Sequence, residues 1–590
     1  MSTALGVVAP EIKVDGAPLP ATWSDALTEL RIERSLCLMA RTTLRFADSG
    51  YRLSASSTFA LGTDVKVGIQ GGSEPLMAGV VTGISLEQTS SDTPELVVTV
   101  DDKAFKLAIG TRVKTYLTSS YSDVLQQIVG NCGLSANVTA NGWSTPHDYV
   151  LQSGSDVAFL QQLCERTGAV WWMDGTTLHV ADASATRATA GVELGRTLTE
   201  FSVRASALRP TSVTVGGWDP NAQQDVSGQN GTAVTTASSN FVAKYIGSAP
   251  SSLNSSVQSS FDMNPEDADD AKRIATALND TWSSSAVIAR GRGLVNAAID
   301  LMTTVQVANA GPTSGDYTVS QVEHIYRHDG FYTRFVAGPL RPIGLVDTLG
   351  QTAPDPGFEI GGLLTAVVTN LADPDNVGRV KVRYNAAGGT IESPWARVVG
   401  MGAGKGRGSV FQPEVNDEVL VGFERGDTRR PVVLGGLFSK TNTLPAGAAV
   451  VGESKVEYRR IMSRLGHIIE LADGTAATAQ HVLLQTASGH KMRLGADRFD
   501  IEVASGKPIA IKAGSAKFEI DEQGNVSIEG TKISLKATGQ LSIEGQAGVE
   551  VKTTAKASIQ GTMVEVKASG VGSVQADGPL TLKGAIVAIN

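Results

Sequence analysis

The clearest pattern in the chain lies between residues 501 and 551, where pairs of apolar residues two positions apart recur at a nearly constant interval. The pairs are Ile501/Val503, Ile509/Ile511, Phe518/Ile520, Val526/Ile528, Ile533/Leu535, Leu541/Ile543 and Val549/Val551. Their first members lie seven to nine residues apart, which makes an octad repeat. Because polar residues fill alternate positions, each pair predicts a short strand with one apolar face and argues against a helix.

A strand of this length buries too little apolar surface to be stable alone, so it must stack on neighbouring strands and face apolar partners across an axis. Two architectures meet this need: a single-chain β-solenoid, and an intertwined prism of several chains in which each strand forms one wall. Eight residues suit one wall of the prism better than a longer solenoid coil, so we favour the prism. Glycines that allow the chain to bend between strands stand at 514, 524, 530, 539, 545 and 561.

Alternation of polar and apolar residues also dominates the rest of the chain. Residues 1–115 alternate in runs such as 65–69 and 95–100, which predicts the strands of a barrel or sandwich. Residues 358–440 combine short alternating strands with glycine turns and have the size of a five-stranded OB-type barrel. Further strands are expected at 170–180, 194–216 and 286–337. The predicted fold class is therefore mainly β with a few short helices.

Two short helices are predicted to interrupt this β framework, at 122–129 and at 155–166. In the second, Ser155 or Asp156 can cap the N-terminus and Gly168 can end the helix.

A longer helix is predicted after residues 219–262, a Ser-, Asn- and Thr-rich stretch that is typical of a long surface loop. Asn264 is a suitable N-cap and Pro265 suits the first helical position, and an apolar stripe then continues to Trp282. Prolines over 338–357 predict a linker.

Composition limits the classes of function. The 590 residues are 42% hydrophobic and 18% charged, which fits several folded domains. The net charge is −9 with no long run of one sign, which argues against a nucleic-acid partner. Because we find neither a secretion signal nor an uninterrupted apolar run of about 18 residues, we expect folding in the cytoplasm without a membrane span.

The three cysteines, Cys37, Cys132 and Cys164, are far apart and lack metal-binding or redox spacing. We predict that they are buried small hydrophobic residues. This usage fits a reducing compartment and leaves later release from the cell open.

Four motifs follow one another between residues 378 and 431. They are Gly378-Arg379-Val380-Lys381-Val382, Trp395-Ala396-Arg397-Val398, Pro413-Glu414-Val415-Asn416-Asp417-Glu418-Val419, and Gly426-Asp427 before Arg430-Pro431. In these motifs the chain resembles the OB domain of the phage baseplate V and VgrG spike family. Residues 159–172 and 321–335 resemble the hub of VgrG and of phage late control D proteins, so the resemblance covers nearly the whole chain.

The resemblance implies an organisation and a function. It implies a homotrimer whose C-terminal octads form a triple-stranded, intertwined β-helix or prism. Such a protein is a structural, non-enzymatic spike of a contractile injection system, which joins inner tube and baseplate proteins to a needle that pierces the target cell envelope. The implied domains are a hub of two β-barrels with helical insertions (1–345), a linker (346–357), an OB-fold domain (358–440), a neck (441–460) and the needle (461–590).

A repeated phrase narrows the expected type of machine. Residues 466–471 and 489–494 share a Gly-His phrase that is similar to the spikes of extracellular contractile injection systems. We therefore expect a phage tail-like particle that is assembled in the bacterial cytoplasm and can be released from the cell.

Two groups of residues suggest a ligand site at first sight, but their spacing argues against one. Residues 400–406 are glycine-rich with one lysine, yet they are too short for a phosphate-binding loop and lack its Ser or Thr. Glu323, His324, His328 and Asp329 do not follow the H-E-x-x-H order and lie where a strand enters a turn.

His467 and His490 stand at equivalent places in two repeats, which predicts a structural hydrogen bond at a strand start rather than a metal or catalytic role. No G-x-S-x-G nucleophile motif occurs. The stretch from Leu437 to His467 is too short for the lysozyme domain that some phage spikes carry. We therefore predict no catalytic, cofactor-binding or metal-binding residues.

The end of the sequence predicts a binding surface. A blunt trimer end would expose apolar side chains, and an exposed apolar patch usually marks a binding site. No histidine follows His490, so the His-x-His iron site of some phage spikes is not available. We predict that a separate PAAR-type tip protein binds Leu580, Leu582, Ile586, Val587 and Ile589.

A second class of function stays open at this point: a secreted or phage-borne β-helical spike that binds or hydrolyses carbohydrate. Such a protein needs clustered surface aromatics or paired carboxylates along the repeat. Residues 501–590 contain Phe518 as their single aromatic residue, which argues against sugar binding.

Overall fold

The computed structural model describes residues 8–90, 92–207, 209–219, 223–232, 234–247, 257–260, 264–340, 362–385, 391–445 and 456–589. The chain forms two compact units, residues 1–443 and 444–590. The predicted linker, 346–357, and the middle of the predicted neck, 441–460, lie outside the described residues. Across the described ranges we find no helix with the length and apolar character needed to span a bilayer.

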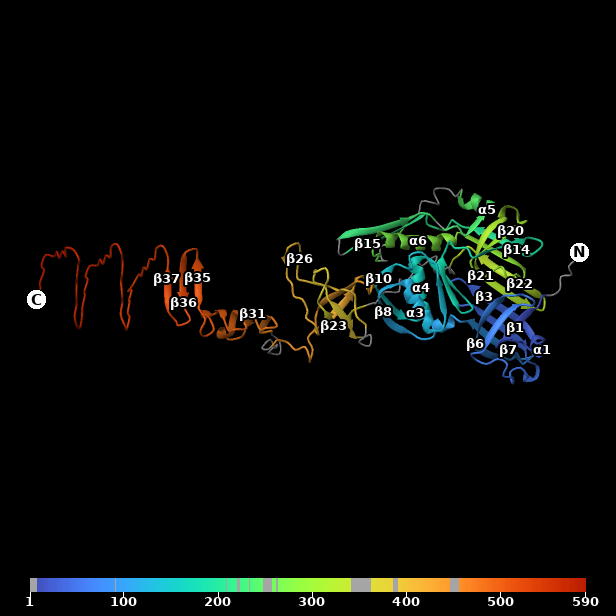
Figure 1. Ribbon diagram of the computed structural model, residues 1–590, viewed down its shortest axis with the longest axis horizontal. Helices are drawn as coiled ribbons and strands as arrows, with labels where there is room; N and C mark the ends of the chain where they lie inside the picture. Colours follow the sequence, from blue (N-terminus) through green and yellow to red (C-terminus); the bar gives the residue numbers. More distant parts are fainter. Residues whose placement is uncertain are drawn as a thin grey trace. The chain divides into compact units, whose positions relative to one another are not determined.

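One sheet of fourteen strands organises the N-terminal part of the first unit (Figure 1). Its main path runs β14-β19-β22-β21-β3-β4-β7-β6-β5-β1-β2, while β17 and β20 pair with β21, and β13 pairs with β20. The strands are β1 (Pro10–Val14), β2 (Ala17–Pro18), β3 (Leu27–Ser35), β4 (Arg41–Ala47), β5 (Asp64–Ile69), β6 (Pro75–Glu87), β7 (Glu95–Asp102), β13 (Ala188–Glu193), β14 (Leu198–Ala205), β17 (Ala237–Ser239), β19 (Val287–Leu294), β20 (Thr303–Ala308), β21 (Gly315–Arg327) and β22 (Gly330–Ala337).

Three smaller sheets and the helices complete the hub region. The strands are β8 (Arg112–Ser120) with β10 (Pro146–Gly154), β9 (Ser135–Val138) with β11 (Ala169–Asp174) and β12 (Thr177–Asp182), and β15 (Ser212–Asp219) with β16 (Gln224–Asn230) and β18 (Val257–Ser260). The helices are α1 (Ala21–Ser24), α2 (Phe105–Ala108), α3 (Tyr121–Asn131), α4 (Asp156–Thr167), α5 (Asn240–Val242) and α6 (Ala268–Ser284). Single turns are η1 (Ser49–Tyr51), η2 (Ala243–Gly247) and η3 (Gly311–Thr313).

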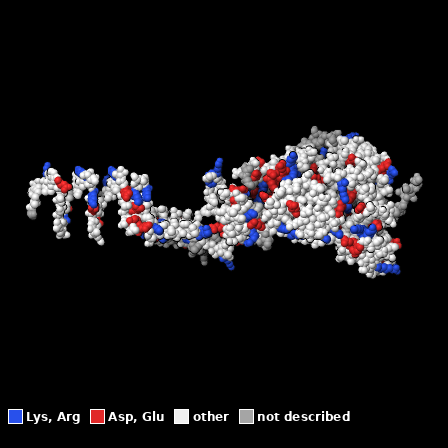
Figure 2. All heavy atoms as spheres, viewed as in Figure 1, with Lys and Arg blue, Asp and Glu red and all other residues white. Residues whose placement is uncertain are grey.

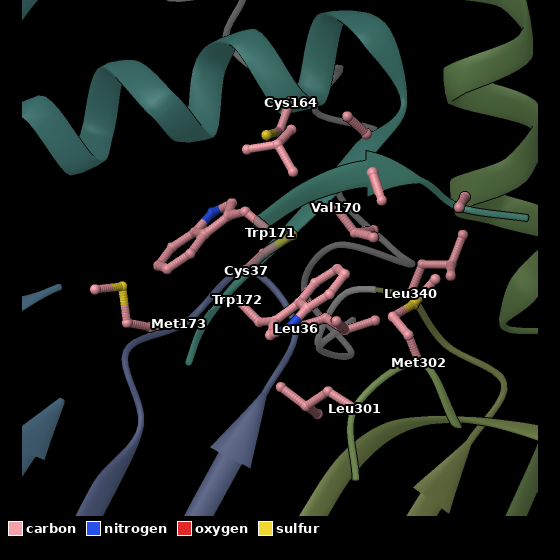
Figure 3. Close-up of a cluster of buried hydrophobic side chains, with 14 of the residues drawn as sticks. Leu36, Cys37, Cys164, Val170, Trp171, Trp172, Met173, Leu301, Met302 and Leu340 are labelled. Carbon is pink, nitrogen blue, oxygen red and sulfur yellow. The ribbon is translucent and has the colours of Figure 1, made fainter. Parts of the chain in front are cut away.

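The large sheet covers two separate hydrophobic cores. The first is built on β1 and β3–β7, where the ring of Trp23 meets those of Phe46 and Phe59 at centroid distances of 5.0 Å. The second joins α3 and α4 to β11, β12, β20 and β21, and Figure 3 shows Trp171 and Trp172 within it. The predicted fold class, mainly β with short helices, is confirmed.

The cysteine prediction holds for two residues of three. Cys37 and Cys164 lie in the second core (Figure 3). The prediction is wrong for Cys132, which is only partly buried because it is the C-cap of α3, at the edge of the core.

Local sequence signals placed α4 well and α6 less well. As predicted, the Ser155 hydroxyl accepts a hydrogen bond from the Ala158 amide, and Gly168 ends α4 with a φ of 76°. The predicted N-cap of α6 is wrong: the cap is Asp267, whose carboxylate accepts from the Asp270 amide at 2.7 Å. Asn264 instead donates a hydrogen bond from its side-chain amide to the backbone oxygen of Glu424. The local sequence around Asn264 does not predict this contact.

A carboxyl group on α6 makes a pH-dependent contribution to stability. Asp280 accepts a hydrogen bond from the Val234 amide at 2.9 Å, and burial raises its pKa to about 6. Its contribution is therefore largest below the ordinary pKa of 3.8 and falls as the pH rises through 6. We expect Asp280→Asn, which keeps the acceptor oxygen, to stabilise the chain by about 1 kcal/mol at pH 7 and to change little at pH 4. Thermal unfolding at both pH values measures this, and a lower melting temperature for the variant at pH 7 would contradict it.

The region after the linker is a small barrel. Its five-stranded sheet has the order β24-β23-β28-β29-β25 and a core that includes Val368, Val382 and Val421. Residues 400–406 enter a hairpin, β26 (Ala403–Gly404) with β27 (Arg407–Gly408), as in a barrel turn. The other elements are β23 (Leu364–Asn370), β24 (Lys381–Tyr384), β25 (Arg397–Val398), β28 (Glu418–Phe423), η5 (Glu424–Gly426) and β29 (Pro431–Gly436).

The second unit begins as two antiparallel sheets. Five strands form a meander: β30 (Tyr458–Met462), β31 (Ile468–Asp473), β32 (Gln480–Gln485), β33 (Lys491–Gly495) and β34 (Phe499–Glu502), with η6 (Ala477–Ala479) before β32. Three more form a second sheet: β35 (Ile509–Ala513), β36 (Ala516–Ile520) and β37 (Val526–Glu529). The octads from 509 to 529 therefore pair within the chain, which differs from the uniform prism that we expected from the repeat.

Candidate functional site

The octads after Glu529 have no partner strands within one copy. None of the described residues 530–589 lies in a hydrogen-bonded strand, and Figure 1 shows this segment as an open, turning trace. The apolar side chains of three predicted pairs are each more than half exposed: Ile533 53%, Leu535 68%, Leu541 56%, Ile543 69%, Val549 58% and Val551 83%. Unpaired backbone groups beside exposed apolar side chains mark a surface that requires partner strands.

The meander of the second unit carries an exposed apolar face. The register places Ile461, Ile469, Leu484, Met492 and Ile501 in one row across its five strands. A second row contains Leu471, Val482, Leu494 and Phe499. The exposed fractions in the two rows run from 39% for Met492 to 58% for Phe499. Such a face is not stable in water, so the meander also lacks a covering partner.

The opposite face of the meander is polar and internally satisfied. Glu470 is buried and pairs with the Arg460 guanidinium, and His481 Nε2 lies 3.1 Å from its other carboxylate oxygen. The contrast between the two faces indicates that the apolar face is the side turned towards the missing partner.

The two histidines of the Gly-His phrase form equivalent hydrogen bonds. His467 Nδ1 accepts from the Ala487 amide, and His490 Nδ1 accepts from the Ala504 amide, each at 3.2 Å. The glycines before these histidines, Gly466 and Gly489, have φ angles of 92° and 96°. A residue with a side chain would be strained in this backbone conformation. The predicted structural hydrogen bonds are confirmed, and they connect successive turns of the meander.

The junction between hub and OB barrel is held by a largely buried arginine, whose side chain is 11% exposed. Arg429 donates to Glu266 Oε1 at 2.7 Å, to the Asn264 backbone oxygen at 3.1 Å and to Asp427 Oδ2 at 2.8 Å. Burial alone would lower the pKa of Arg429, but the Asp427 and Glu266 carboxylates outweigh burial and raise it. Arg429 therefore stays charged and links the OB barrel to the turn before α6.

Neighbouring residues extend this junction. Arg430 donates to the backbone oxygens of Trp218, at 2.6 Å, and Pro265, at 2.8 Å. Tyr149 and Leu151 of β10 belong to the hydrophobic core of the OB barrel. Polar and apolar contacts thus join the two domains into one unit.

A cavity of about 870 Å³ borders the junction, and its lining includes His147, Glu266, Arg397, Glu424 and Arg430. Its charged groups largely neutralise one another. His147 Nδ1 lies 3.4 Å from Glu266 Oε2, and Arg397 pairs with Glu424. Burial would raise the pKa of Glu266, but the hydrogen bond from His147 and the charge of Arg429 lower it to about 2. The paired charges suit a clamp between the two domains.

The residues that first suggested a metal site are not gathered together. His324 is buried, its Nδ1 lies 2.9 Å from Thr333 Oγ1, and burial followed by the charge of Arg34 lowers its pKa to about 3. Glu323 points to the other face of β21, where it pairs with Arg31 at 2.5 Å. In the part of the chain that the structure describes, no group of three His, Cys, Asp or Glu residues is placed to hold a metal ion.

The predicted tip residues are all exposed in one copy: Leu580 55%, Leu582 64%, Ile586 89%, Val587 52% and Ile589 83%. Their role in binding a tip protein stays a prediction.

Two family models match the chain. Residues 364–438 match the type VI secretion system/phage-baseplate injector OB domain. Residues 4–327, more than half of the chain, match the Alg8 N-terminal domain, so the chain belongs to the family that this model describes. The type VI secretion system spike protein VgrG5 of Pseudomonas aeruginosa is 35% identical over 142 residues. The chain belongs to the VgrG and phage-baseplate spike family.

The likeness to individual members of the spike family is partial. The alignment with VgrG5 covers 22% of this chain and 17% of that protein. The spike protein VgrG3 of Vibrio cholerae is 41% identical over 76 residues, 12% of this chain and 7% of that protein. The chain thus matches less than a fifth of the length of either relative. An E. coli type VI secretion component, described as similar to T4 tail proteins gp27 and gp5, is 15% identical with a TM-score of 0.46, over 72% of this chain and all of that chain.

Sequence reasoning missed the junction in this spike-family chain. The motif Gly426-Asp427 before Arg430-Pro431 includes Arg430, but it predicts no contact between Arg429 and Glu266. The available signal was an Asp followed by two adjacent arginines before Pro431, since buried arginines need carboxylate partners. Nothing in the sequence pointed to Glu266, which lies 163 residues from Arg429 along the chain.

Proposed function

We propose that three copies of this chain form a structural, non-enzymatic spike and hub at the tip of a contractile injection machine. Membership of the spike family supports the role. The observation that carries the threefold arrangement is the segment 530–589, whose backbone is unpaired and whose apolar side chains are exposed in one copy. Closure of three such segments about an axis would pair the strands between copies and leave no lateral edge.

The mechanism is force transmission. In this proposal the hub contacts inner tube and baseplate proteins, and the contracting particle drives the needle through the envelope of a target cell. The Arg429 junction passes the load from hub to OB barrel through ion pairs and hydrogen bonds of one largely buried guanidinium. Strands paired between three copies resist unfolding because no copy can leave without breaking its pairing with both others.

We also infer the type of particle from the Gly-His turns. Their repetition favours the spike of an extracellular contractile injection system, assembled in the bacterial cytoplasm as part of a phage tail-like particle and able to be released. Purification of intact particles from culture supernatant and from lysed cells, followed by detection of this chain in each, tests the inference. Detection only in association with the cell envelope would contradict release.

The native mass of the full-length chain tests the proposed function. We expect about 184 kDa, three times the 61.4 kDa of one chain, and a band of that size that survives SDS at room temperature but dissociates on heating. A monomer under native conditions would overturn the proposal and would favour a single-chain solenoid.

Removal of the tip residues should abolish capture of a PAAR-type tip protein. We expect deletion of 580–590 to prevent binding of the tip protein. The trimer should persist, because most of segment 530–589, which pairs between copies in the proposed trimer, remains. Co-purification with a co-expressed PAAR-type protein measures the effect. Thr581→Asp, at an outward position of the same segment, is the matched control and should bind normally. Unchanged binding after the deletion would rule out this surface.

A further inference from the structure

The charges that follow three apolar pairs of the unpaired segment alternate in sign. Lys536 follows Ile533/Leu535, Glu544 follows Leu541/Ile543, and Lys552 follows Val549/Val551. Each charge lies next to the second apolar residue of its pair, so it points to the opposite side of the strand. All three side chains are exposed, and Figure 2 shows both basic and acidic residues along the C-terminal segment.

Two of these charges have no partner within one copy. In the ranges that the structure describes, neither Lys536 nor Glu544 forms an ion pair, whereas Lys552 Nζ lies 2.6 Å from Glu550 Oε1 of the same copy. In a strand, Glu550 and Lys552 would both point to the side opposite the apolar pair Val549/Val551, because residues two apart share one side.

Threefold closure determines which octads become neighbours. If each octad of a copy forms one wall, the next octad forms the following wall one layer higher. The threefold axis places the equivalent octad of the other copies on the other walls. Each octad of one copy therefore stacks directly on the next octad of a neighbouring copy, at the strand spacing of about 4.8 Å.

This stagger brings opposite charges together. Lys536 of one copy lies beside Glu544 of the next, and Glu544 lies beside Lys552 of the third. If one copy slips by one octad, Lys536 meets Lys552 and like charges face each other across adjacent strands, which is unfavourable.

The apolar core cannot make this distinction. The three pairs 533/535, 541/543 and 549/551 consist only of Ile, Leu and Val, so a slip of eight residues within them exchanges one branched apolar pair for another. Register is weakly specified wherever a repeat leaves the core unchanged, and charged residues outside the core are the usual remedy.

We propose that Lys536, Glu544 and Lys552 form a charge ladder between copies that sets their stagger at one octad. The partner is a second copy of this chain, and the proposal rests on the proposed trimeric function. The ladder ends at Gln560, the next residue in the same octad position, which carries no charge.

Engineered cysteines in the full-length chain can report the stagger directly. Ser534 and Ser542 are outward residues of consecutive octads, so Ser534→Cys with Ser542→Cys should form disulfides between copies, because adjacent strands meet the required Cα separation of about 4.4–6.8 Å. Ser542→Cys with Ser558→Cys, two octads apart, should link copies only after a slip. The unmodified chain, oxidised in parallel, controls for Cys37, Cys132 and Cys164.

Charge variants then test the ladder. We expect Glu544→Lys to reduce Ser534/Ser542 cross-linking at least threefold and to increase Ser542/Ser558 cross-linking. Full inversion, Lys536→Glu with Glu544→Lys and Lys552→Glu, should restore the original pattern. High salt should reproduce part of the loss, since it screens exposed charges.

The possible results separate the ladder from the trimer. Trimers whose cross-linking is unchanged by Glu544→Lys would overturn the ladder and leave the trimeric spike standing. Failure of the inverted variant to restore the pattern would also overturn the ladder. A chain that is monomeric before any substitution would overturn the proposed function itself.

Discussion

Replacing Ile543 with aspartate is expected to abolish the SDS-resistant trimer. In the proposed prism, three copies place this residue at equivalent positions around the axis, so Ile543→Asp would bury three carboxylates in an apolar core. Burial of an unpaired charge costs several kcal/mol per group, and the three charges also repel one another. Native mass and migration in SDS at room temperature measure the loss.

The adjacent residue provides the control. Ser542→Asp introduces the same charge one position earlier, on the outward side of the same strand, and should leave trimer mass and SDS resistance almost unchanged. If Ile543→Asp were as resistant as the unmodified chain, the apolar pairs would not face a common axis. Because both variants carry the same added charge, a difference between them reports the side of the strand rather than net charge.

Arg429→Ala should produce the largest effect in the first unit. It leaves the buried Asp427 carboxylate without its cation and removes a partner of Glu266, whose side chain is 44% exposed, so we expect a loss of about 3 kcal/mol. Hydrogen exchange should increase in α6 and in β28–β29, on the two sides of the junction. Arg407→Ala, on an exposed hairpin of the same barrel, is the control and should change stability by about 0.5 kcal/mol or less.

The same junction predicts a dependence on pH. Because the folded state lowers the pKa of Glu266 to about 2 from its ordinary 4.5, its contribution to stability is present above pH 4.5 and is lost as the pH falls towards 2. Unfolding measured between pH 7 and pH 3 should show this loss in the unmodified chain and a smaller loss in Arg429→Ala. Equal pH profiles for the two chains would mean that Arg429 does not stabilise the Glu266 carboxylate.

Sequence reasoning succeeded where the signal was local or repeated. Ser155 and Gly168 cap the two ends of α4, as predicted, because capping depends on residues within one turn. His467 and His490 form equivalent hydrogen bonds because the residues around them repeat. It failed at Asn264, where contacts with the OB barrel determine the conformation of the residue.

The candidate assembly surface was predictable only in part. Octad spacing predicted that short strands need partners, and the exposed side chains of 530–589 agree with that need. Spacing did not show that 509–529 would pair antiparallel within the chain, because the same alternation serves both arrangements. The sequence also gave no warning of the Arg429–Glu266 ion pair, which joins residues distant along the chain.

The unpaired segment has a consequence for biosynthesis. A newly made copy exposes unpaired strand edges and apolar side chains until it associates with two other copies. Monomers are therefore prone to aggregate through any other exposed β-edge. Needle yield should therefore rise more steeply than linearly with expression level. Translation of many copies from one messenger would favour correct assembly, because siblings then emerge close together in space and time.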